Sequence, residues 1–278
     1  MRIQKLIRRY WVDVVSLLVI GVVFIVPFVF VLLTASKTRQ DAALLTFSWP
    51  KEFRLIENLR EVMTWGDNRM VRALWNSTLL TLGSVTLIVL FSALVAFVMQ
   101  RRADRLAAVV GSFMLAGLII PPAVVPTIFL LQWLGLYKTL VGLIMVEVAY
   151  SMPFAILIMR AFMGSIPREL DEAAVIDGAS PMRVFFSVIL PLLRPAIVTV
   201  VVTSSVTIFN DFVGPLYFLP GSENVTAPLT LFSFISQFTS QWNLLFADVV
   251  VITIIPLIVF IFFQRQLVSG MMGGAIKG

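Results

Sequence analysis

The sequence has 278 residues, 59% of them apolar and only 13% charged, and its mean hydropathy of +0.99 excludes a water-soluble domain of this size. The net charge is +6, but Lys and Arg separate apolar runs instead of clustering on one polar face, which argues against a nucleic-acid-binding domain. The absence of Cys and His excludes disulfide scaffolds, thiol or imidazole catalysis, and zinc sites built on these residues.

Six apolar stretches are long enough to cross a bilayer as helices, which takes about 20 residues each. They are residues 14–33, 73–100, 106–137, 139–159, 195–219 and about 241–263. The third stretch is too long for one straight helix and contains Pro121, Pro122 and Pro126, so we expect one span with a break there. The predicted fold class is therefore an all-α integral membrane protein with six transmembrane helices.

The distribution of basic residues predicts the orientation, because short cytoplasmic loops are enriched in Lys and Arg. One side of the predicted spans holds thirteen of them, whereas Lys138 is alone in the two short loops of the other side. Both termini of this multi-pass protein are therefore expected in the cytoplasm. The thirteen are Arg2, Lys5, Arg8, Arg9, Arg101, Arg102, Arg105, Arg160, Arg168, Arg183, Arg194, Arg265 and Lys277.

The chain is expected to fall into three parts along its length. Residues 1–35 form a cytoplasmic N-terminus and a first helix that is expected to be retained, because its apolar run is long and Leu33-Thr34-Ala35 is a poor small-residue cleavage site. Residues 36–72 form a folded extracytoplasmic segment with Trp49 and Trp65 as candidate interfacial anchors. Residues 73–278 hold the other five helices, a cytoplasmic loop at 165–194 and a cytoplasmic tail at 264–278.

The loop between the fourth and fifth spans is predicted to contain two short helices. Ser165 is a candidate N-cap for the first, with Pro167 and Glu169 in its first turn. Ser180 followed by Pro181 is a second N-cap and first-turn pair. Gly178 lies between them, where a left-handed turn that ends a helix requires glycine. On charge pattern alone, the loop could equally be a solvated linker with helix propensity.

Glu172-Ala173-Ala174, followed by Gly178-Ala179 and then Ile189-Leu190-Pro191-Leu192, resembles the cytoplasmic signature loop of the permease subunits of ATP-binding-cassette importers. In that family the loop forms a coupling helix that docks in a cleft of the ATPase subunit. The resemblance therefore implies an ATPase-coupling role for this loop. The residues concerned are Asp171, Glu172, Ala173, Ala174, Asp177, Gly178, Ala179 and Pro191.

The resemblance covers most of the chain, and the span pattern and Gly-rich ending look like the shorter permease subunit of maltose-type carbohydrate importers. It implies an inner-membrane location, a second homologous permease subunit, two ATPase subunits carrying ATP and Mg, an extracytoplasmic solute-binding protein and a carbohydrate substrate. Nucleic acid is not an expected partner. The chain has no phosphate-binding Gly-x-x-x-x-Gly-Lys-Ser/Thr loop, so we expect a translocation subunit without cofactor or metal and without enzyme activity of its own.

The C-terminal tail is Gly-rich, and the resemblance implies that it docks at the interface between the two ATPase subunits. The candidate docking residues are Gly270, Gly273, Gly274 and Lys277. Glycine content alone would favour a frayed terminus instead.

Ionisable groups within membrane spans are costly and mark candidate functional sites. Glu147 lies well inside the fourth span, so it either pairs across helices or faces a wet cavity. Asn210 and Asp211 precede Gly214-Pro215, which suggests a break that exposes backbone to a cavity. These three polar residues are the candidates for the translocation pathway. Asp248 lies within two turns of the outer end of the sixth span, and reaching the interface or bonding to another helix would each explain it.

The loop after the fifth span holds turn formers and hydrogen-bonding side chains, among them Gly221, Ser222, Glu223 and Asn224. The resemblance implies that such a loop can project into the docked solute-binding protein. The simpler interpretation is an ordinary connector.

The leading hypothesis is thus a permease subunit that couples ATP hydrolysis on a separate subunit to alternating access for a sugar or oligosaccharide. An ion-coupled secondary transporter is the alternative, with Glu147, Asp211 and Asp248 as ion sites, although no inverted repeat is visible in the sequence. A membrane-embedded enzyme ranks third, because only carboxylate chemistry would remain to it.

Overall fold

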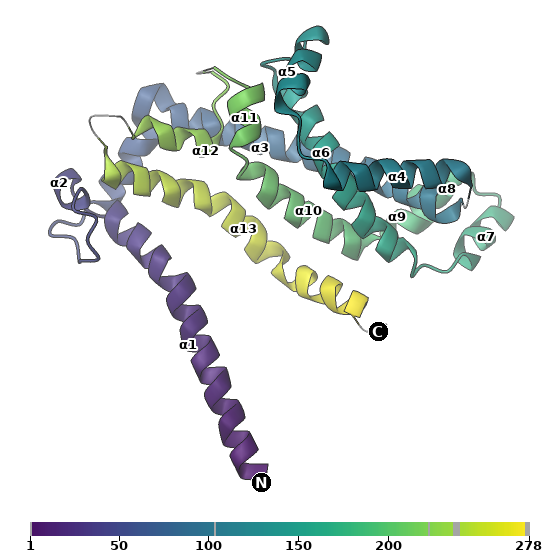
Figure 1. The fold of residues 1–278 in the computed structure, drawn as a ribbon, viewed down its shortest axis with the longest axis horizontal. Helices are drawn as coiled ribbons and strands as arrows, with labels where there is room; N and C mark the ends of the chain where they lie inside the picture. Colours follow the sequence, from purple (N-terminus) through teal and green to yellow (C-terminus); the bar gives the residue numbers. More distant parts are fainter. Residues whose placement is uncertain (1, 103, 222, 236–239, 276–278) are drawn as a thin grey trace. The chain divides into compact units, whose positions relative to one another are not determined.

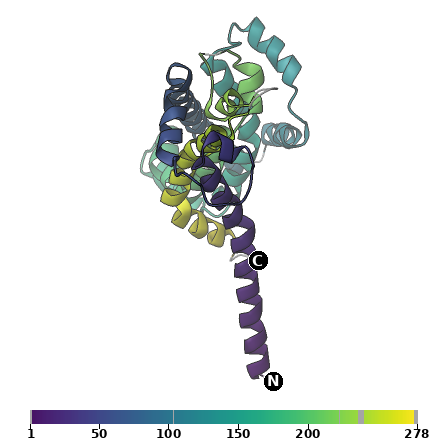
Figure 2. The same ribbon diagram turned by 90° about the vertical axis from the view of Figure 1, so that its left-hand side faces the viewer.

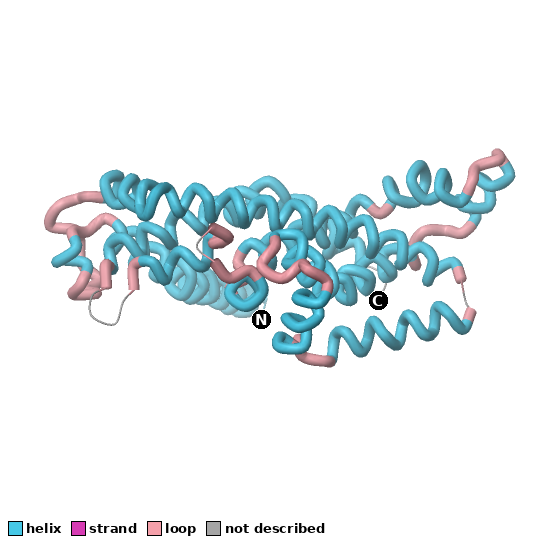
Figure 3. The backbone as a smooth tube through the Cα atoms, turned by 90° about the horizontal axis from the view of Figure 1, so that it is seen from above, coloured by secondary structure: helices cyan, strands magenta, loops and turns pink. Residues whose placement is uncertain are grey.

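The computed structural model describes residues 2–102, 104–221, 223–235 and 240–275, and the side chains of residues 11–264 within these ranges except that of Leu106. In the described ranges the only β pairing is an isolated bridge between Ile235 and Ser240. The rest is helix and connecting loop (Figure 3), which confirms the predicted all-α fold.

Long helices alternate with short ones along the chain (Figure 1). The long helices are α1 (Arg2–Ala35), α3 (Leu55–Arg101), α6 (Leu140–Met163), α10 (Arg194–Phe209) and α13 (Trp242–Ala275). Of these, α3 is kinked, because its backbone is non-helical at residues 65–68. The shorter helices are α2 (Arg39–Ala42), α4 (Arg105–Ile119), α5 (Val124–Trp133), α7 (Glu169–Ile176), α8 (Pro181–Val184), α9 (Leu190–Leu192), α11 (Val213–Phe218), α12 (Ala227–Thr230), the π-helix η1 (Phe185–Ile189) and the 3-10 helix η2 (Leu231–Ser233).

Within the described residues, four helices are long and apolar enough to cross a membrane, and six spans result if each of two bent pairs is one span. The four lie in α1, α3, α6 and α13. The first bent pair is α4 and α5, which meet at 119° just after Ile120, so the predicted break at Pro121 and Pro122 is confirmed. The second pair joins Pro181–Leu192 to α10 at 74°.

The first span is one continuous helix, α1, drawn in purple in Figures 1 and 2. No side chain in its most apolar window is buried by the rest of the chain. A helix that is apolar on all sides and is not buried by the rest of the chain is suited to a lipid environment or to another subunit.

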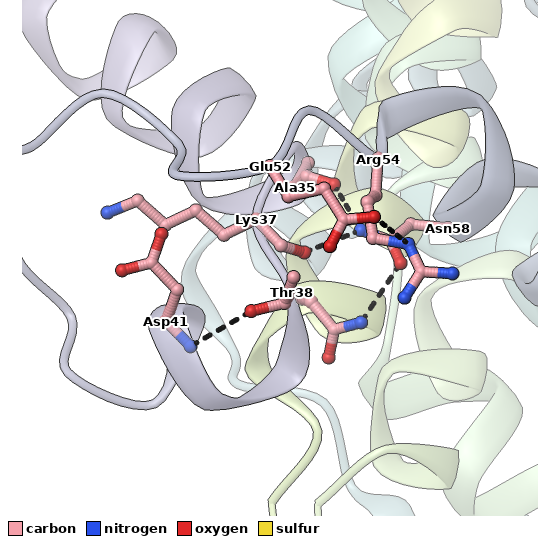
Figure 4. Close-up of polar contacts among 8 residues, drawn as sticks. Ala35, Lys37, Thr38, Asp41, Glu52, Arg54 and Asn58 are labelled. Carbon is pink, nitrogen blue, oxygen red and sulfur yellow. Dashed lines mark hydrogen bonds and ion pairs between the residues drawn. The ribbon is translucent and has the colours of Figure 1, made fainter.

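By their internal contacts the residues form two compact units, Met1–Val71 with Thr230–Ile254, and Arg72–Leu229 with Ile255–Gly278. The first unit is fastened where α1 ends and α3 begins (Figure 4). The buried amide of Asn58 donates to the carbonyl oxygens of Ala35 at 2.8 Å and Lys37 at 2.9 Å. Its own oxygen accepts a bond from the amide of Asn243 at 3.0 Å. One side chain therefore satisfies carbonyl groups at the end of α1, which have no partner within the helix, and joins three chain segments.

The loop after α2 closes over Lys37, whose side chain is fully buried. Its ammonium group donates to the carbonyl oxygen of Thr46 at 2.7 Å and to the hydroxyl of Ser48 at 3.1 Å. Trp49 in this loop is 79% exposed, whereas Trp65 packs against Phe234 with ring centroids 5.3 Å apart. A role of either indole as an interfacial anchor stays a prediction.

Asp248 is fully buried in the first unit. The explanation that its side chain reaches the membrane interface is therefore wrong. The Thr230 hydroxyl lies 3.1 Å and 2.9 Å from the two carboxylate oxygens of Asp248 and 3.7 Å from the sulfur of Met70. The other explanation, a hydrogen bond to another chain segment, is confirmed. A buried carboxylate far from water needs such a donor.

The second unit is built around an apolar core formed by α3, α6, η1 and α10. Ala93 and Ala96 of α3, Ala155 of α6 and Ala196 of α10 are almost fully buried in it. Small side chains let helix backbones approach closely, which is how helices associate where the solvent is itself apolar. Because this core is apolar, helix breaks and helix ends determine where the functional groups of the second unit lie.

We expect Thr230→Val to lower stability, because it removes the hydroxyl donor from a buried carboxylate while keeping the side-chain volume. The expected loss is about 1–2 kcal/mol, seen as a lower thermal midpoint of the detergent-solubilised chain. Thr86→Val is the matched control, since the exposed Thr86 hydroxyl bonds only the Leu82 carbonyl of its own helix. Equal effects of the two changes would contradict a structural role for the buried bond.

Candidate functional site

The segment between α6 and α10 forms two short helices, as predicted, separated by a turn. Gly178 has φ +80°, the left-handed conformation expected for it, and a side chain there would meet no atom within 4 Å. The Ser180 hydroxyl accepts from the backbone N–H of Arg183 at 3.4 Å, and Pro181 opens α8, so this N-cap is confirmed. The predicted N-cap at Ser165 is wrong: its hydroxyl donates to the carbonyl of Phe162 at 2.7 Å.

The first helix, α7, begins after Arg168 with no side-chain cap. The Ser165 hydroxyl does not cap it, because it bonds the Phe162 carbonyl at the end of α6. Its first turn instead carries Glu169, Asp171 and Glu172, and negative charge there is favourable for the helix dipole. Acidic residues, and not a capping hydroxyl, therefore stabilise the start of this helix.

An ion pair between Asp171 and Arg101 ties α7 to the end of α3. Both side chains are mostly buried, and Arg101 also donates to the carbonyl of Ile166 at 3.4 Å. Next to this pair, Arg168 donates to the carbonyl of Gln100 at 3.0 Å. Asp171, one of the predicted coupling residues, is therefore engaged within the chain. The pairing of Arg101 with Asp171 was not predicted from the sequence, because the two residues lie 70 positions apart.

The remaining predicted coupling residues divide into an inward and an outward set. Ala174 and Ala179 pack against the apolar core of the second unit. The exposed set consists of Glu172, Ala173, Asp177, Gly178 and Pro191. Beside them α7 exposes Val175 at 59% and Ile176 at 85%. An apolar surface next to the carboxylates of Glu172 and Asp177 is suited to docking against a partner.

The π-helical turn η1 ends at Ile189, two residues before Pro191. The N–H of Leu190 bonds the carbonyl of Phe185, five residues back, so the helix is widened at this point. Proline has no N–H to donate to the carbonyl four residues before it, and a wider turn accommodates this loss. Phe185 itself is buried in the core and packs on Phe97 of α3 at 5.6 Å.

A cavity of about 290 Å³ lies in the second unit beside the break between α10 and α11. Glu147 and Asp211, two of the three pathway candidates, line it from different elements. Glu147 is 8% exposed. It thus faces a cavity, one of its two sequence-based expectations, and Asp211 beside it lies in the break between α10 and α11, not on a helix.

The break itself is held by Asp211. Its two carboxylate oxygens accept bonds from the backbone N–H groups of Val213 at 3.1 Å and Gly214 at 2.8 Å. These groups open α11 and have no partner within the helix. The third candidate, Asn210, turns back and donates to the carbonyl of Val206 at 2.8 Å. The predicted interruption is therefore real but begins at Asn210, ahead of the Gly-Pro pair.

Gly214 permits the close approach on which this arrangement depends. A side-chain carbon at this position would collide with Asp211 and would lie 3.0 Å from a carboxyl oxygen of Glu147. Only glycine therefore allows the start of α11 to lie against both acidic side chains.

Sequence analysis missed three further polar residues of the cavity, Tyr150, Ser151 and Thr207. A signal for them was present, because residues three or four apart share a helix face. Tyr150 and Ser151 follow Glu147 by three and four positions, and Thr207 precedes Asp211 by four. Hydroxyl groups beside carboxylates make the cavity suitable for a ligand rich in hydroxyl groups.

The loop after α11 is fastened to the start of the second-unit part of α3. Glu223 pairs with Arg72 at 2.5 Å, and the Asn76 amide donates to the carbonyl oxygens of Glu223 at 3.2 Å and Val225 at 3.0 Å. Asn224 donates to the carbonyl of Lys138 at 3.2 Å. Glu223 and Gly221 are exposed, and Ser222 lies outside the described residues.

The C-terminal docking candidates Gly270, Gly273 and Gly274 fall within α13, and Lys277 lies outside the described residues. In the part of the chain with described side chains, no group of three or more acidic residues is placed to hold a metal ion.

Comparison with known proteins places this arrangement in a family. The chain is 30% identical over 265 residues to the probable starch degradation products transport system permease protein AmyC of Thermoanaerobacterium thermosulfurigenes, covering 94% of each chain. Its fold matches a bacterial ATP-binding-cassette transporter that imports the acidic polysaccharide alginate, with a TM-score of 0.77, 18% identity and coverage of 95% and 96%. It also matches a bacterial alginate transporter in complex with an alginate pentasaccharide-bound periplasmic protein, with a TM-score of 0.67, 15% identity and coverage of 96% and 99%.

Residues 88–273 match the family described as binding-protein-dependent transport system inner membrane component. This range contains α4 to α11, the segment between α6 and α10, and the cavity at the α10–α11 break. The chain is therefore a multi-pass membrane permease that belongs to the binding-protein-dependent transport system inner membrane components.

Proposed function

We propose that the chain is the permease subunit of a carbohydrate importer that is driven by ATP hydrolysis on separate ATPase subunits and supplied by an extracytoplasmic solute-binding protein. Family membership supports the role in transport. The carbohydrate substrate is supported by relatives named for starch degradation products and alginate. One of these neighbours is in complex with a sugar-bound periplasmic protein. A second, homologous permease subunit completes the translocation pathway.

The observation that carries the coupling proposal is the linkage of α7 to the membrane helices. The exposed side of α7 and Gly178 docks on the ATPase subunit, with Glu172 as its charged contact. The Arg101–Asp171 ion pair passes displacement of α7 to α3. Ala174 and Ala179, packed on the core, pass it to η1 and α6. Movement of the docked ATPase then shifts these helices as a rigid group.

The cavity between Glu147 and Asp211 is this subunit's part of the pathway. Carboxylates accept strong hydrogen bonds from hydroxyl groups, and Tyr150 adds an aromatic face that a sugar ring can cover. The loop that carries the exposed residues Gly221 and Glu223, fastened by the Arg72–Glu223 pair, faces the solute-binding protein. The Gly-rich tail with Gly270, Gly273, Gly274 and Lys277 contacts the ATPase subunits.

Orientation is tested by cysteine labelling, which is clean because the chain has no native Cys. Thr46→Cys should react with a membrane-impermeant thiol reagent in intact cells, and Ser180→Cys should react only after the membrane is permeabilised. Both positions are exposed in the structure. Reaction of Ser180→Cys in intact cells would reverse the proposed orientation.

Coupling is tested at Gly178. A β-branched residue in the left-handed region costs about 1–3 kcal/mol, so Gly178→Val should distort the docking turn and reduce binding-protein-stimulated ATPase activity of the assembled complex about tenfold. Gly178→Asn is the control, since Asn tolerates this conformation and no atom lies within 4 Å of the added carbon.

Glu172→Lys should have the same effect as Gly178→Val, because it reverses the charge at the docking surface. Normal stimulation in both variants would remove the coupling role from α7. Equal losses in Gly178→Val and Gly178→Asn would mean that side-chain volume, rather than backbone conformation, matters at the turn.

The pathway is tested with Thr207→Cys, which places a thiol in the cavity. A cationic methanethiosulfonate reagent should react about five- to tenfold faster than an anionic one, relative to the same ratio at Thr46→Cys, because two carboxyl groups line the cavity. Adding Glu147→Gln should lower the ratio, and transported sugar should slow both reactions. A cavity cysteine that reacts with neither reagent would exclude this cavity from the pathway.

A further inference from the structure

A second and larger cavity of about 570 Å³ lies in the second unit among the end of α3, α4 and α6. Its wall is mostly apolar and follows α4. The apolar and small residues that line it are Met99, Ala107, Ala108, Gly111, Ser112, Met114, Leu115, Leu118 and Leu157. It differs from the cavity at Glu147 in lining, in size and in the elements that form it, and we call it the α4 groove.

One end of the α4 groove is polar and carries Arg102, Arg160, Gln100 and Asp104. Arg102 follows the last residue of α3, and Arg160 lies in the last turn of α6. Both arginines therefore sit where membrane-spanning helices end, at the level of lipid headgroups.

The two guanidinium groups are available for a ligand. Within the described residues, neither Arg102 nor Arg160 makes a side-chain hydrogen bond or an ion pair, whereas their neighbours Arg101 and Arg168 are engaged by Asp171 and the carbonyl of Gln100. The one carboxylate of the groove belongs to Asp104, which is turned to the backbone N–H of Ala107 at 3.0 Å as the N-cap of α4.

The length of the apolar wall fits one membrane leaflet. From Ala107 to Leu118 the helix rises about 1.5 Å per residue, or about 16 Å in all. Half of the hydrocarbon core of a bilayer is about 15 Å. A ligand that fills the α4 groove thus needs an anionic head at the arginines and an apolar chain about one leaflet long.

We propose that the α4 groove binds an anionic phospholipid, with the phosphate at Arg102 and Arg160 and one acyl chain along α4. Guanidinium groups recognise phosphate through paired hydrogen bonds, and basic pockets between membrane helices are suited to phospholipid headgroups. The lipid fills space between α4 and the α3–α6 pair, next to the Arg101–Asp171 link, and so holds these helix ends in place. This site is independent of the substrate that the transporter carries.

The test is native mass spectrometry of the full-length chain in detergent, titrated with phosphatidylglycerol or phosphatidylcholine of identical acyl chains. The wild-type protein should retain phosphatidylglycerol at least about tenfold more tightly, equivalent to about 1.4 kcal/mol. Arg102→Gln with Arg160→Gln should bring the two lipids to near parity. Arg105→Gln is the matched control, since Arg105 is exposed in the same segment and does not line the groove.

A second variant tests the apolar part of the groove. A side-chain carbon at Gly111 would meet only Met99, at 3.5 Å, so Gly111→Leu extends into the groove without a backbone clash. It should weaken retention of both lipids by a similar factor and leave the thermal midpoint of the lipid-free chain unchanged.

Three results would overturn the proposal. Equal wild-type affinity for the two lipids would exclude headgroup recognition. Equal losses in Arg105→Gln and in the double variant would reduce it to general surface charge. Displacement of phosphatidylglycerol by millimolar inorganic phosphate, together with normal binding to Gly111→Leu, would identify a free-anion site instead.

Discussion

The structure depends on one constraint, that a backbone N–H or C=O group inside a membrane must find a partner within the protein. Regular helices satisfy it by themselves, so each interruption of a helix needs a side chain to replace the missing bonds. Asp211 does this at the start of α11, where it accepts bonds from the N–H groups of Val213 and Gly214. Asn58 does the same for carbonyl groups at the end of α1. Asp211 is thus first of all a structural requirement of a broken helix.

This constraint also explains how a cavity with two carboxyl groups arises. Breaking a helix between α10 and α11 requires Asp211, and Gly214 then lets the new helix start lie against Glu147. The break between α4 and α5 adds Pro122 and Val124 to the wall of the same cavity. The interruptions that weaken the spans as helices are therefore also what opens the polar cavity between them.

The sequence predicted those features that depend on local chemistry. The left-handed turn at Gly178, the Ser180 cap and the break at Pro121 and Pro122 all follow from the conformational limits of single residues. Ser165 was mispredicted, because a hydroxyl near a helix end can serve either the helix before it or the one after it. The Arg101–Asp171 pair was not predictable, since nothing in a single sequence relates residues 70 positions apart.

The acidic residues of the spans differ in whether their carboxylate oxygens already accept hydrogen bonds within the chain. Both oxygens of Asp248 are engaged by one hydroxyl, and both oxygens of Asp211 by backbone N–H groups, so each has a structural partner. Glu147 is placed differently, because within the described residues it receives no backbone N–H or hydroxyl bond and lies on the cavity wall with Asp211. A carboxyl group on the wall of a cavity keeps hydrogen-bonding capacity for a ligand that enters the cavity. Among the three acidic residues, Glu147 is therefore the one that no backbone N–H or hydroxyl group of the described residues holds, which supports its proposed place in the pathway.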